Sequence, residues 1–528
     1  MDEFLTIFLV LLGILGYVSL VTYFKKKGSL EKHGMSSWFG IIMWRTSRGR
    51  NFIDLLARPK RFWTGYGFLA KTICVLVMVS VMALLIVEAF LVPNIPADQA
   101  PTPDMLIGLP GINSAIPLWY GILGLVVGVV IHEFAHGILT RVGQMRLKSL
   151  GVLLFIFPIG AFVEPDEDEL VKTEKKRRTA VYAAGPATNI IFALVFAILF
   201  SSVMVSSAQV AQEGPMLTTV YDNTPAAMAG LRTGAQIVEV NGVPVASNGY
   251  SNFDAPAPGT SVPITYYYQG DRMETSAVSG LVILGVSQDL PAGKAGLKEG
   301  MILTSLNGTV VTNEADFRSA LAKMVPGATV ELSALRYDEA SASYVDAGLT
   351  TITPANKRDV VSGSSENIAY LGVSSAYLGA VGADPHVALQ NMAHPYAKVS
   401  SVEGFVTQTL VYIAMPFSGL QPLDDPYRSI YEPAGLFAGW DNDVFWVLAN
   451  SFYWIFWLNL MLGMTNALPA VPLDGGFLFR DWIDSIVQKV KKGADQKERD
   501  RIVSTITYAF IMIVFFLIVW QLIGPRIL

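Results

Sequence analysis

One short segment carries residue types that could hold a metal ion and activate water. His132, Glu133 and His136 form the pattern His-Glu-Phe-Ala-His. Residues four apart on a helix lie on one face, so both imidazoles can reach a single Zn²⁺ ion. Glu133 stands beside the first histidine, where its carboxylate can act as general base on metal-bound water. The chain has five histidines and one cysteine, which excludes a disulfide framework and a cysteine-rich zinc module.

The His-Glu-x-x-His pattern lies inside an apolar stretch of the chain. Residues 124–131 before it and 137–140 after it carry no charge. Charged groups inside a membrane are costly, and by default they indicate function. His132 follows Pro117 by 15 residues, about 22 Å along a helix, and an apolar bilayer core is about 30 Å thick. We therefore expect the metal to lie within the membrane. A structural histidine pair with Glu133 as a buried ion partner is the alternative.

A catalytic zinc site needs a third protein ligand, and Asp474 is the first candidate. It lies in the segment 466–476, where two prolines and two glycines interrupt the helix. Irregular backbone at membrane depth is tolerated only where protein or a polar cavity surrounds it. Asp474 is also the only acidic residue between Asp443 and Asp481. A turn or helix-capping aspartate is the competing interpretation, and Glu164 is the next candidate for the ligand.

The composition indicates a membrane protein that could position these residues. Of the 528 residues, 52% are hydrophobic and 15% are charged, which excludes a disordered chain and is not typical of a soluble domain. The net charge of −5 gives no indication of nucleic-acid binding. Six apolar runs are long enough to cross a bilayer. They cover Phe4–Phe24, Phe68–Val92, Pro117–Thr140, Ala180–Ser206, Val444–Met464 and Ile502–Ile523.

Two further apolar segments do not fit the pattern of a full span. Leu150–Val163 is too short, and Pro158 and Gly160 interrupt it, so we expect a re-entrant segment that is buried in protein. Val399–Phe417 is ambiguous and could be an interfacial helix.

Lysine and arginine residues in the short loops predict the orientation. Lys25–Arg61 carries ten of them and Lys172–Arg178 carries five, so both segments are expected in the cytoplasm. Pro93–Ile116 has none and is expected outside. With six spans in a plasma membrane, both chain ends and the region from about Ala208 to Asp443 lie outside the cytoplasm. The His-Glu-x-x-His pattern then lies within the membrane, near its cytoplasmic face.

The external region contains a repeat at an offset of 66 residues. Thr224–Gly234 matches Leu290–Gly300, and an Asn-Gly pair follows each copy at the same offset. Each copy predicts a short helix that ends at glycine, then a strand and a tight turn. The pattern resembles PDZ domains of the protease-associated type, with Ala235 and Met301 in place of the usual aspartate. The spacing is short for a complete domain, so one copy could be trimmed.

The resemblance to PDZ domains implies a groove that receives an extended peptide by strand addition. Two alternatives remain for this region. It could act as a size filter that keeps bulky proteins away, or it could be a spacer that binds no ligand.

Together the membrane motifs resemble the site-2 protease family of intramembrane zinc metalloproteases. The resemblance is carried by His132-Glu133-x-x-His136, Gly185-Pro186-x-x-Asn189, the loop Phe157–Pro165, and Asn466-x-x-Pro469 with Leu473-Asp474-Gly475. It implies regulated intramembrane proteolysis, in which a peptide bond within the transmembrane segment of a membrane protein is hydrolysed.

The resemblance also implies roles for individual residues. One Zn²⁺ ion per chain would be held by His132, His136 and Asp474, and Glu133 would activate water. Asn189 and Asn466 would contact the substrate backbone or the developing oxyanion. A buried asparagine that bridges two helices is the competing account of both.

The expected fold is a polytopic α-helical membrane protein with about six transmembrane helices, a re-entrant segment and an inserted extracytoplasmic tandem PDZ-like α+β region. The expected divisions are 1–92, two N-terminal helices with a basic loop; 117–206, core helices; 208–375, two PDZ-like domains (about 208–280 and 281–375); 376–443, a connector; 444–484, a core helix with the Leu-Asp-Gly-Gly motif; and 485–528, a basic loop and a last helix.

Partners expected from the sequence are a transmembrane protein substrate, a peptide or protein ligand of the PDZ-like region, and the lipid bilayer, but no nucleic acid. Three rival functions stay open. A receptor or scaffold could display PDZ-like domains without catalysis. A prenyl-protein protease also has His-Glu-x-x-His but lacks the Leu-Asp-Gly element, and a transporter could use histidine and aspartate to carry ions.

Overall fold

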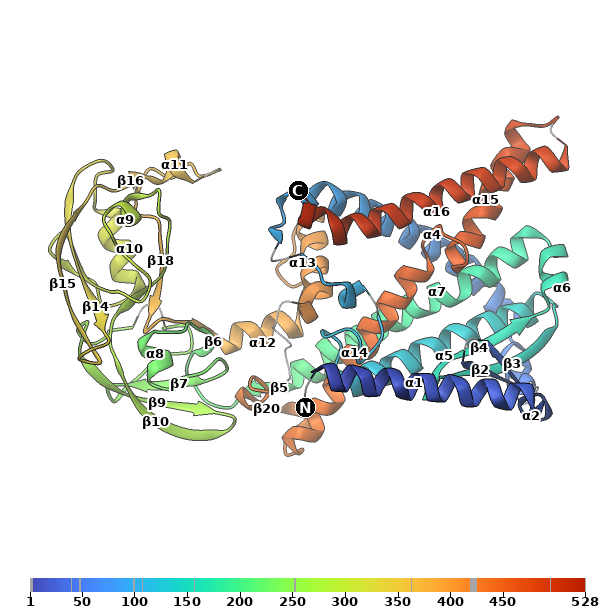
Figure 1. Ribbon diagram of the computed structural model, residues 1–528, viewed down its shortest axis with the longest axis horizontal. Coiled ribbons are helices and arrows are strands. Elements are labelled where there is room, and N and C mark those ends of the chain that lie inside the picture. Colours follow the sequence, from blue (N-terminus) through green and yellow to red (C-terminus); the bar gives the residue numbers. More distant parts are fainter. Residues whose placement is uncertain are drawn as a thin grey trace. The chain divides into compact units, whose positions relative to one another are not determined.

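The structure is a computed structural model that describes residues 3–38, 40–46, 49–97, 100–106, 108–155, 157–250, 253–361, 363–417, 425–493 and 495–527. The chain divides into two compact units. The first combines Met1–Phe200 with Ala449–Leu528 and is mostly helical, whereas the second, Ser201–Leu448, holds two large sheets (Figure 1).

Within the described residues, five helices are long and apolar enough to cross a membrane. Each overlaps one of the apolar runs predicted from the sequence: α4 (Lys60–Leu91), α5 (Leu118–Val142), α7 (Lys175–Ile198), α14 (Asn442–Asn466) and α16 (Gln496–Ile527). The first predicted span forms the helix α1 (Glu3–Lys26), which is not among these five. The side chains of residues 3–11 lie outside the described part, so the structure leaves the sixth span as a prediction.

The segment predicted to be re-entrant forms a β-hairpin. Strand β3 (Leu147–Phe155) pairs antiparallel with β4 (Phe157–Pro165). Two strands from the basic N-terminal loop, β1 (Met35–Trp38) and β2 (Ile41–Thr46), extend the hairpin to a sheet in the order β1-β2-β3-β4. The sequence analysis placed no strand in that loop. Among the described strands, β4 is an edge of this sheet.

Glycines on α5 allow a close approach between α5 and α14. A Cβ atom at Gly124 would lie 2.7 Å from the backbone oxygen of Trp454, and one at Gly128 would lie 2.6 Å from Leu462 Cδ1. Small residues let membrane helices pack with their backbones close together. The two helices therefore hold their facing side chains at short range.

Ion pairs fix α15 (Asp474–Val490) against α7. Asp481 accepts two charge-assisted hydrogen bonds from Arg178, at 2.6 Å from Nε and 2.5 Å from Nη2. Lys175 Nζ lies 2.5 Å from Asp484 Oδ2. A bidentate arginine–carboxylate pair adds geometric specificity as well as energy. The first residue of α15, Asp474, is thereby tied to the helix that runs beside α5.

The second unit contains two sheets with the same strand order. The first sheet runs β10-β9-β7-β6-β19 with β8 beside β7, and the second runs β15-β14-β12-β11-β18 with β13 beside β12. Strands of the first are β6 (Met216–Val220), β7 (Gln236–Val240), β8 (Val243–Pro244), β9 (Ser261–Tyr268), β10 (Asp271–Val278) and β19 (Ala380–Ala383). Strands of the second are β11 (Leu281–Val286), β12 (Ile302–Leu306), β13 (Thr309–Val310), β14 (Val330–Asp338), β15 (Ser343–Ile352) and β18 (Val373–Tyr377). A short helix follows β6 and β11, α8 (Pro225–Met228) and α9 (Pro291–Lys294), as the repeat predicts.

The two copies are nested rather than consecutive. Strand β19, which completes the first sheet by pairing with β6, comes after the whole of the second sheet. The second copy is thus inserted between β10 and β19 of the first. The predicted division at residue 375 falls inside β18 and leaves out β19, so the boundaries 208–280 and 281–375 do not correspond to two closed sheets.

Matching hydrogen bonds show the same nesting. The N–H of Ala226 donates to Leu378 O at 2.9 Å in the first copy, and the N–H of Ala292 donates to Leu371 O at 2.9 Å in the second. The donors follow the 66-residue repeat, but the acceptors lie seven residues apart in the opposite order. They belong to a short second repeat, Ala-Tyr-Leu-Gly, which occurs at 369–372 and at 376–379.

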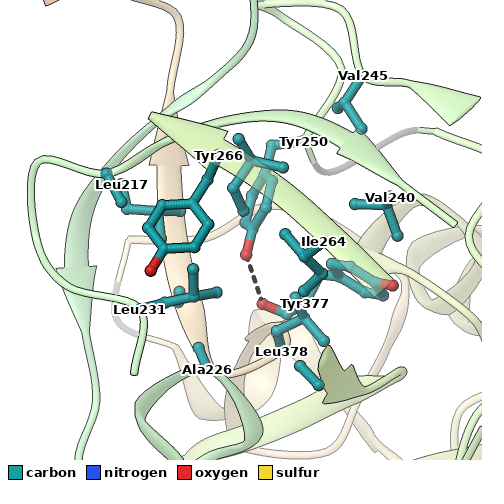
Figure 2. Packing of buried hydrophobic residues seen from close by; sticks show 14 of the residues in the cluster. Leu217, Ala226, Leu231, Val240, Val245, Tyr250, Ile264, Tyr266, Tyr377 and Leu378 are labelled. Carbon is teal, nitrogen blue, oxygen red and sulfur yellow. Dashed lines mark hydrogen bonds between the residues drawn. The ribbon is translucent and has the colours of Figure 1, made fainter. Parts of the chain in front are cut away.

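Figure 2 shows how the junction between the copies enters the core of the first one. Tyr377, the last residue of β18, is fully buried among residues of the first sheet, and its backbone oxygen accepts a 2.9 Å hydrogen bond from the Tyr250 hydroxyl. Burial raises the pKa of the Tyr377 phenol to about 12. The hydroxyl therefore stays protonated at neutral pH.

One difference between the copies lies in the segment before β14 and before its counterpart β9. Helix α10 (Glu314–Ala322) connects β13 to β14 in the second copy. The corresponding stretch of the first copy, residues 245–250 and 253–260, contains no helix.

The described residues of the predicted connector 376–443 form several short elements. It contains β19, α12 (Pro385–Ala393), α13 (Val402–Ala414) and β20 (Tyr431–Pro433), which pairs with β5 (Ala208–Val210). Helix α13 covers most of the ambiguous apolar segment and exposes Val402, Phe405 and Val406. An interfacial location for α13 remains a prediction.

Candidate metal centre

Three predicted ligands converge in the first unit. His132 and His136 lie one turn apart on α5, and Asp474 is the first residue of α15. The two Nε2 atoms are 3.1 Å apart, and Asp474 Oδ2 lies 3.1 Å from Nε2 of His132 and 3.2 Å from Nε2 of His136. Both histidines are buried and the aspartate is partly buried. The fold thus brings together residues that are more than 330 positions apart.

The spacing of the three atoms fits a small tetrahedral ion. Zinc bonds of about 2.0–2.1 Å to nitrogen and oxygen in tetrahedral geometry place neighbouring ligand atoms about 3.3 Å apart. The observed separations of 3.1–3.2 Å lie close to that value. Two imidazoles and one carboxylate are also a donor set that suits zinc.

Hydrogen bonds on the far side of each ring orient the histidines. His136 Nδ1 is 2.8 Å from Val181 O, a carbonyl that can only accept, so Nδ1 carries the proton. His132 Nδ1 is 2.9 Å from Asn189 Oδ1. When Nδ1 donates, the neutral ring presents the lone pair of Nε2. Both lone pairs then point at the position between the rings and Asp474, as metal ligation requires.

Gly185 on α7 keeps space open beside the two rings. A Cβ atom at this position would lie 2.5 Å from Nε2 of His132 and 2.5 Å from Nε2 of His136. Real Cβ atoms do not approach that closely, so a side chain here would displace the histidines. The Gly-Pro-x-x-Asn motif therefore has two effects on the site. Its glycine leaves space for the two imidazole rings, and Asn189 forms a hydrogen bond with His132.

Glu133 connects the site to the hairpin. Its Oε2 accepts a 2.7 Å hydrogen bond from the backbone N–H of Val163 in β4. Within the described residues Oε1 accepts no hydrogen bond from the protein, and the side chain is half-buried. Oε2 is thus fixed at the edge of the sheet, whereas Oε1 is available to accept a proton.

The two asparagines predicted to contact substrate lie in different settings. Asn189 is fully buried, and besides accepting from His132 it donates from Nδ2 to Gly128 O and to Asn459 Oδ1, both at 3.2 Å. Both amide hydrogens are therefore used within the protein, which leaves no N–H of Asn189 to donate to a substrate or an oxyanion. These contacts favour the alternative, a buried asparagine that bridges helices. Asn466 donates to Leu462 O one turn earlier in α14, at 3.1 Å.

Glu164, the second candidate for the third ligand, lies away from the three converging atoms. Its Oε2 accepts a 2.5 Å hydrogen bond from Ser149 Oγ and lies 3.5 Å from Arg45 Nε. Its side chain therefore connects the hairpin to the neighbouring strand β2.

The sequence analysis did not single out Asn459. This residue is fully buried in α14, in contact with Asn189. A sequence signal was available, because Asn450 and Asn459 are the two amides in the apolar, tryptophan-rich run Val444–Met464, and polar residues inside a membrane tend to be functional.

Comparison with known proteins gives several relatives. An uncharacterized protein of Methanocaldococcus jannaschii, MJ0971, is 31% identical over 185 residues, 34% of this chain and 48% of that protein. A Neisseria meningitidis protein with the provisional name zinc metalloprotease NMA0084 is 27% identical over 267 residues, 40% of this chain and 58% of that protein. The regulator of sigma-W protease RasP of Bacillus subtilis is 25% identical over 256 residues, 46% of this chain and 54% of that protein. The chain spans about half the length of these curated relatives.

A family model described as peptidase family M50 matches residues 120–514. The match includes the paired histidines, the Gly-Pro-x-x-Asn motif and Asp474, together with the intervening second unit. Because it covers more than half of the sequence, it shows that the chain belongs to peptidase family M50, the site-2 protease family.

Proposed function

We propose that this protein is an intramembrane zinc metalloendopeptidase, which hydrolyses peptide bonds within transmembrane segments of membrane proteins in regulated intramembrane proteolysis. The observation that carries the proposal is the convergence of His132 Nε2, His136 Nε2 and Asp474 Oδ2. Both histidines and Glu133 lie on α5, a helix long and apolar enough to span a membrane. Family membership and the names of two relatives, a zinc metalloprotease and a regulator of sigma-W protease, support it.

In this proposal, His132, His136 and Asp474 hold one Zn²⁺ ion per chain. Bound zinc polarises a carbonyl and lowers the pKa of its water to about 7. Glu133 accepts the proton of the attacking water on Oε1 and can pass it to the leaving amine, while its Oε2 stays anchored to Val163. The buried Nδ1 hydrogen bonds keep both rings in the tautomer that binds metal.

Metal removal tests this function. Treating the purified protein with 1,10-phenanthroline is expected to stop cleavage of a model transmembrane substrate, and added Zn²⁺ is expected to restore it. Mg²⁺ is expected not to restore it, because that ion prefers oxygen ligands to imidazole. The measurement is the appearance of cleavage products in detergent or liposomes. A scaffold or a transporter would show no chelator-sensitive cleavage in the same assay.

We also propose that β4 holds the substrate as an added strand. A peptide bond in a helix is shielded by its own hydrogen bonds, so the substrate must unwind before attack. The N–H of Val163 points away from β3, towards Glu133, and side-by-side positions in a strand recur every second residue. Ala161 therefore presents its N–H and C=O on the same outer edge. An extended segment paired there would pass beside Glu133.

Ala161→Pro tests the outer edge of β4. Proline removes an N–H that the β3–β4 ladder does not use, and it is tolerated on edge strands. Loss of one substrate hydrogen bond, about 1 kcal/mol, is expected to slow cleavage about fivefold, and the ring adds a steric barrier to the incoming strand. Rates of the purified variant are compared with those of Ala161→Ser, which keeps the N–H. Equal rates with equal zinc content would contradict strand addition at this edge.

For the second unit we propose two PDZ-like domains that limit access to the membrane site. The shared strand order and the α8 and α9 helices support the PDZ-like assignment. In the second copy the helix α10 contacts the edge strand β18, and the first copy has no helix at the position that corresponds to α10 in its described residues. If one copy docks a peptide, the second copy is therefore the proposed site.

Excision of the second copy distinguishes between two proposed roles of this copy, exclusion of bulky substrates and binding of a peptide. Gly280 O accepts from the N–H of Leu378 at 2.9 Å, so residues 281–376 can be replaced by a short Gly-Ser linker. Tyr377 is retained because it belongs to the core of the first copy. Cleavage of a long-ectodomain substrate is expected to rise relative to a short-ectodomain version of the same substrate.

Two other outcomes of the excision are informative. Slower cleavage of substrates that carry one particular external tail would indicate docking instead of filtering. An unchanged ratio between the two substrates would leave the second copy as a spacer. Zinc content serves as the control for an intact membrane unit.

We further propose that the protein lies in the plasma membrane with six spans, α1 being the first, and with both ends and the second unit outside the cytoplasm. The distribution of lysine and arginine supports this orientation. Impermeant maleimide labelling of cysteines introduced into each loop measures it, and the only native cysteine, Cys74, is buried. Labelling of the 25–61 loop from the external side would overturn it.

A further inference from the structure

We propose that Asn459 on α14 is a positioning residue for the metal centre. Acting through Asn189, it holds His132 in the tautomer whose Nε2 can bind the ion. The inference rests on the proposed function for the identity of the ion, but it concerns contacts of the protein alone.

The first step is the orientation of the Asn459 amide. Its Nδ2 donates to Ile455 O, one turn earlier in α14, at 2.7 Å. A carbonyl oxygen only accepts, so the nitrogen of the amide must occupy that position. Asn459 Oδ1 is thereby directed at Asn189, where it lies 3.2 Å from Nδ2. Both side chains are fully buried, which keeps water from substituting for either contact.

The second step is the orientation of Asn189. Its Nδ2 faces two acceptors, Asn459 Oδ1 and Gly128 O, both at 3.2 Å. Reversal of the amide would place its oxygen against both of them. The oxygen is therefore held towards His132 Nδ1, at 2.9 Å.

The third step concerns the ring itself. With an acceptor beside Nδ1, the neutral imidazole of His132 carries its proton there and leaves the lone pair of Nε2 for the metal. A reversed Asn189 would present its N–H groups to Nδ1 and favour the proton on Nε2. That tautomer has no lone pair to offer on the side of Asp474.

The two histidines use different kinds of acceptor at Nδ1, which explains why only His132 needs a second residue to fix the orientation of its acceptor. His136 uses a backbone carbonyl, Val181 O, which cannot rotate. His132 uses a side-chain amide, which can. Both amides lie beside Gly128, because a Cβ atom there would be in van der Waals contact with Asn459 Oδ1 at 3.4 Å and with Asn189 Nδ2 at 3.5 Å.

The experiment compares two substitutions of Asn459 in the full-length purified protein. Asn459→Leu removes the acceptor while nearly keeping side-chain size. Zinc affinity, measured by competition with a chromogenic chelator, is expected to fall about tenfold, the lower end of the effect of groups that orient metal ligands. Asn459→Asp is expected to stay within about threefold of wild type, because a buried carboxyl group is neutral and can donate to Ile455 O and accept from Asn189.

A matched control is Asn450→Leu, which removes another buried amide from the same helix. Its zinc affinity is expected to equal that of wild type. The visible absorption of Co²⁺-substituted protein gives a second readout, in which Asn459→Leu should change the band intensities and Asn459→Asp should not. Circular dichroism confirms that each variant retains its helix content.

The inference is overturned if Asn459→Leu binds Zn²⁺ as tightly as wild type. It is also overturned if Asn459→Asp loses as much affinity as Asn459→Leu, because packing alone would then explain the loss. If wild-type protein binds no zinc, both this inference and the proposed function fail. If zinc binding follows the expected order but no substrate is cleaved, the inference stands and the proposed function fails.

Discussion

Replacing Glu133 with glutamine is expected to lower the rate of substrate cleavage at least about 100-fold, with zinc content unchanged. Glutamine has nearly the same shape but cannot accept a proton from the attacking water. Its side-chain oxygen can still accept from the N–H of Val163, so β4 is expected to keep its position. The three proposed ligands are untouched by this change.

Product formation by the purified variant and its metal content by mass spectrometry provide the measurement. Glu164→Gln is the matched control, because Glu164 is a carboxylate of the same hairpin that contacts Ser149 and Arg45. That variant is expected to stay within a few-fold of the wild-type rate. Residual turnover of Glu133→Gln above about a hundredth of wild type would argue against Glu133 as the general base.

Asp474→Ala is expected to lower zinc affinity and cleavage rate together, each by more than about 100-fold, the upper end of the effect of groups that only orient ligands. Its Oδ2 is the only oxygen among the three converging atoms. Two imidazoles alone leave the ion with an open coordination shell and without a negatively charged ligand. Zinc affinity is measured by chelator competition and activity on the same preparation.

Asp481→Asn is the control for this prediction. Asp481 lies on the same helix, α15, but its carboxylate pairs with Arg178 and not with the histidines. The variant weakens the attachment of α15 to α7 and is expected to keep one zinc ion per chain. If Asp474→Ala retained full zinc content and full rate, a different residue would have to be the third ligand.

Local spacing explains what the sequence predicts well about the site. His132 and His136 are four residues apart, so any helix places them on one face. Asp474 became a candidate because few acidic residues occur in the apolar core and because glycine and proline interrupt the helix there. The orientation of Asn189 could not be predicted in the same way. It depends on Gly128 O and Asn459 Oδ1, which only tertiary packing brings within hydrogen-bond distance.

The sheets also combine elements that nearby residues specify with strands that form only through distant contacts. Helix α8, strand β7 and their turn recur in the second copy because each is specified within about 20 residues, and the 66-residue repeat reports them. The edge strands β18 and β19 are paired through contacts distant in sequence, so that repeat does not contain them. Likewise β1 and β2 have no strong sequence pattern of their own. Strand β2 pairs with β3, about 100 residues later, and β1 pairs with β2.

Nesting of the two copies also imposes an order on their completion during synthesis. All strands of the second sheet lie within residues 281–377, so that sheet can close as soon as this continuous segment is available. The first sheet begins earlier in the chain, but Val220 of β6 must wait for Ala380 of β19, 160 residues later. A ribosome therefore releases the start of the first copy long before the strand that closes it. Until residue 383 has been synthesised, one edge of β6 is left without its partner strand, and the copy that is begun first is the one that is finished last.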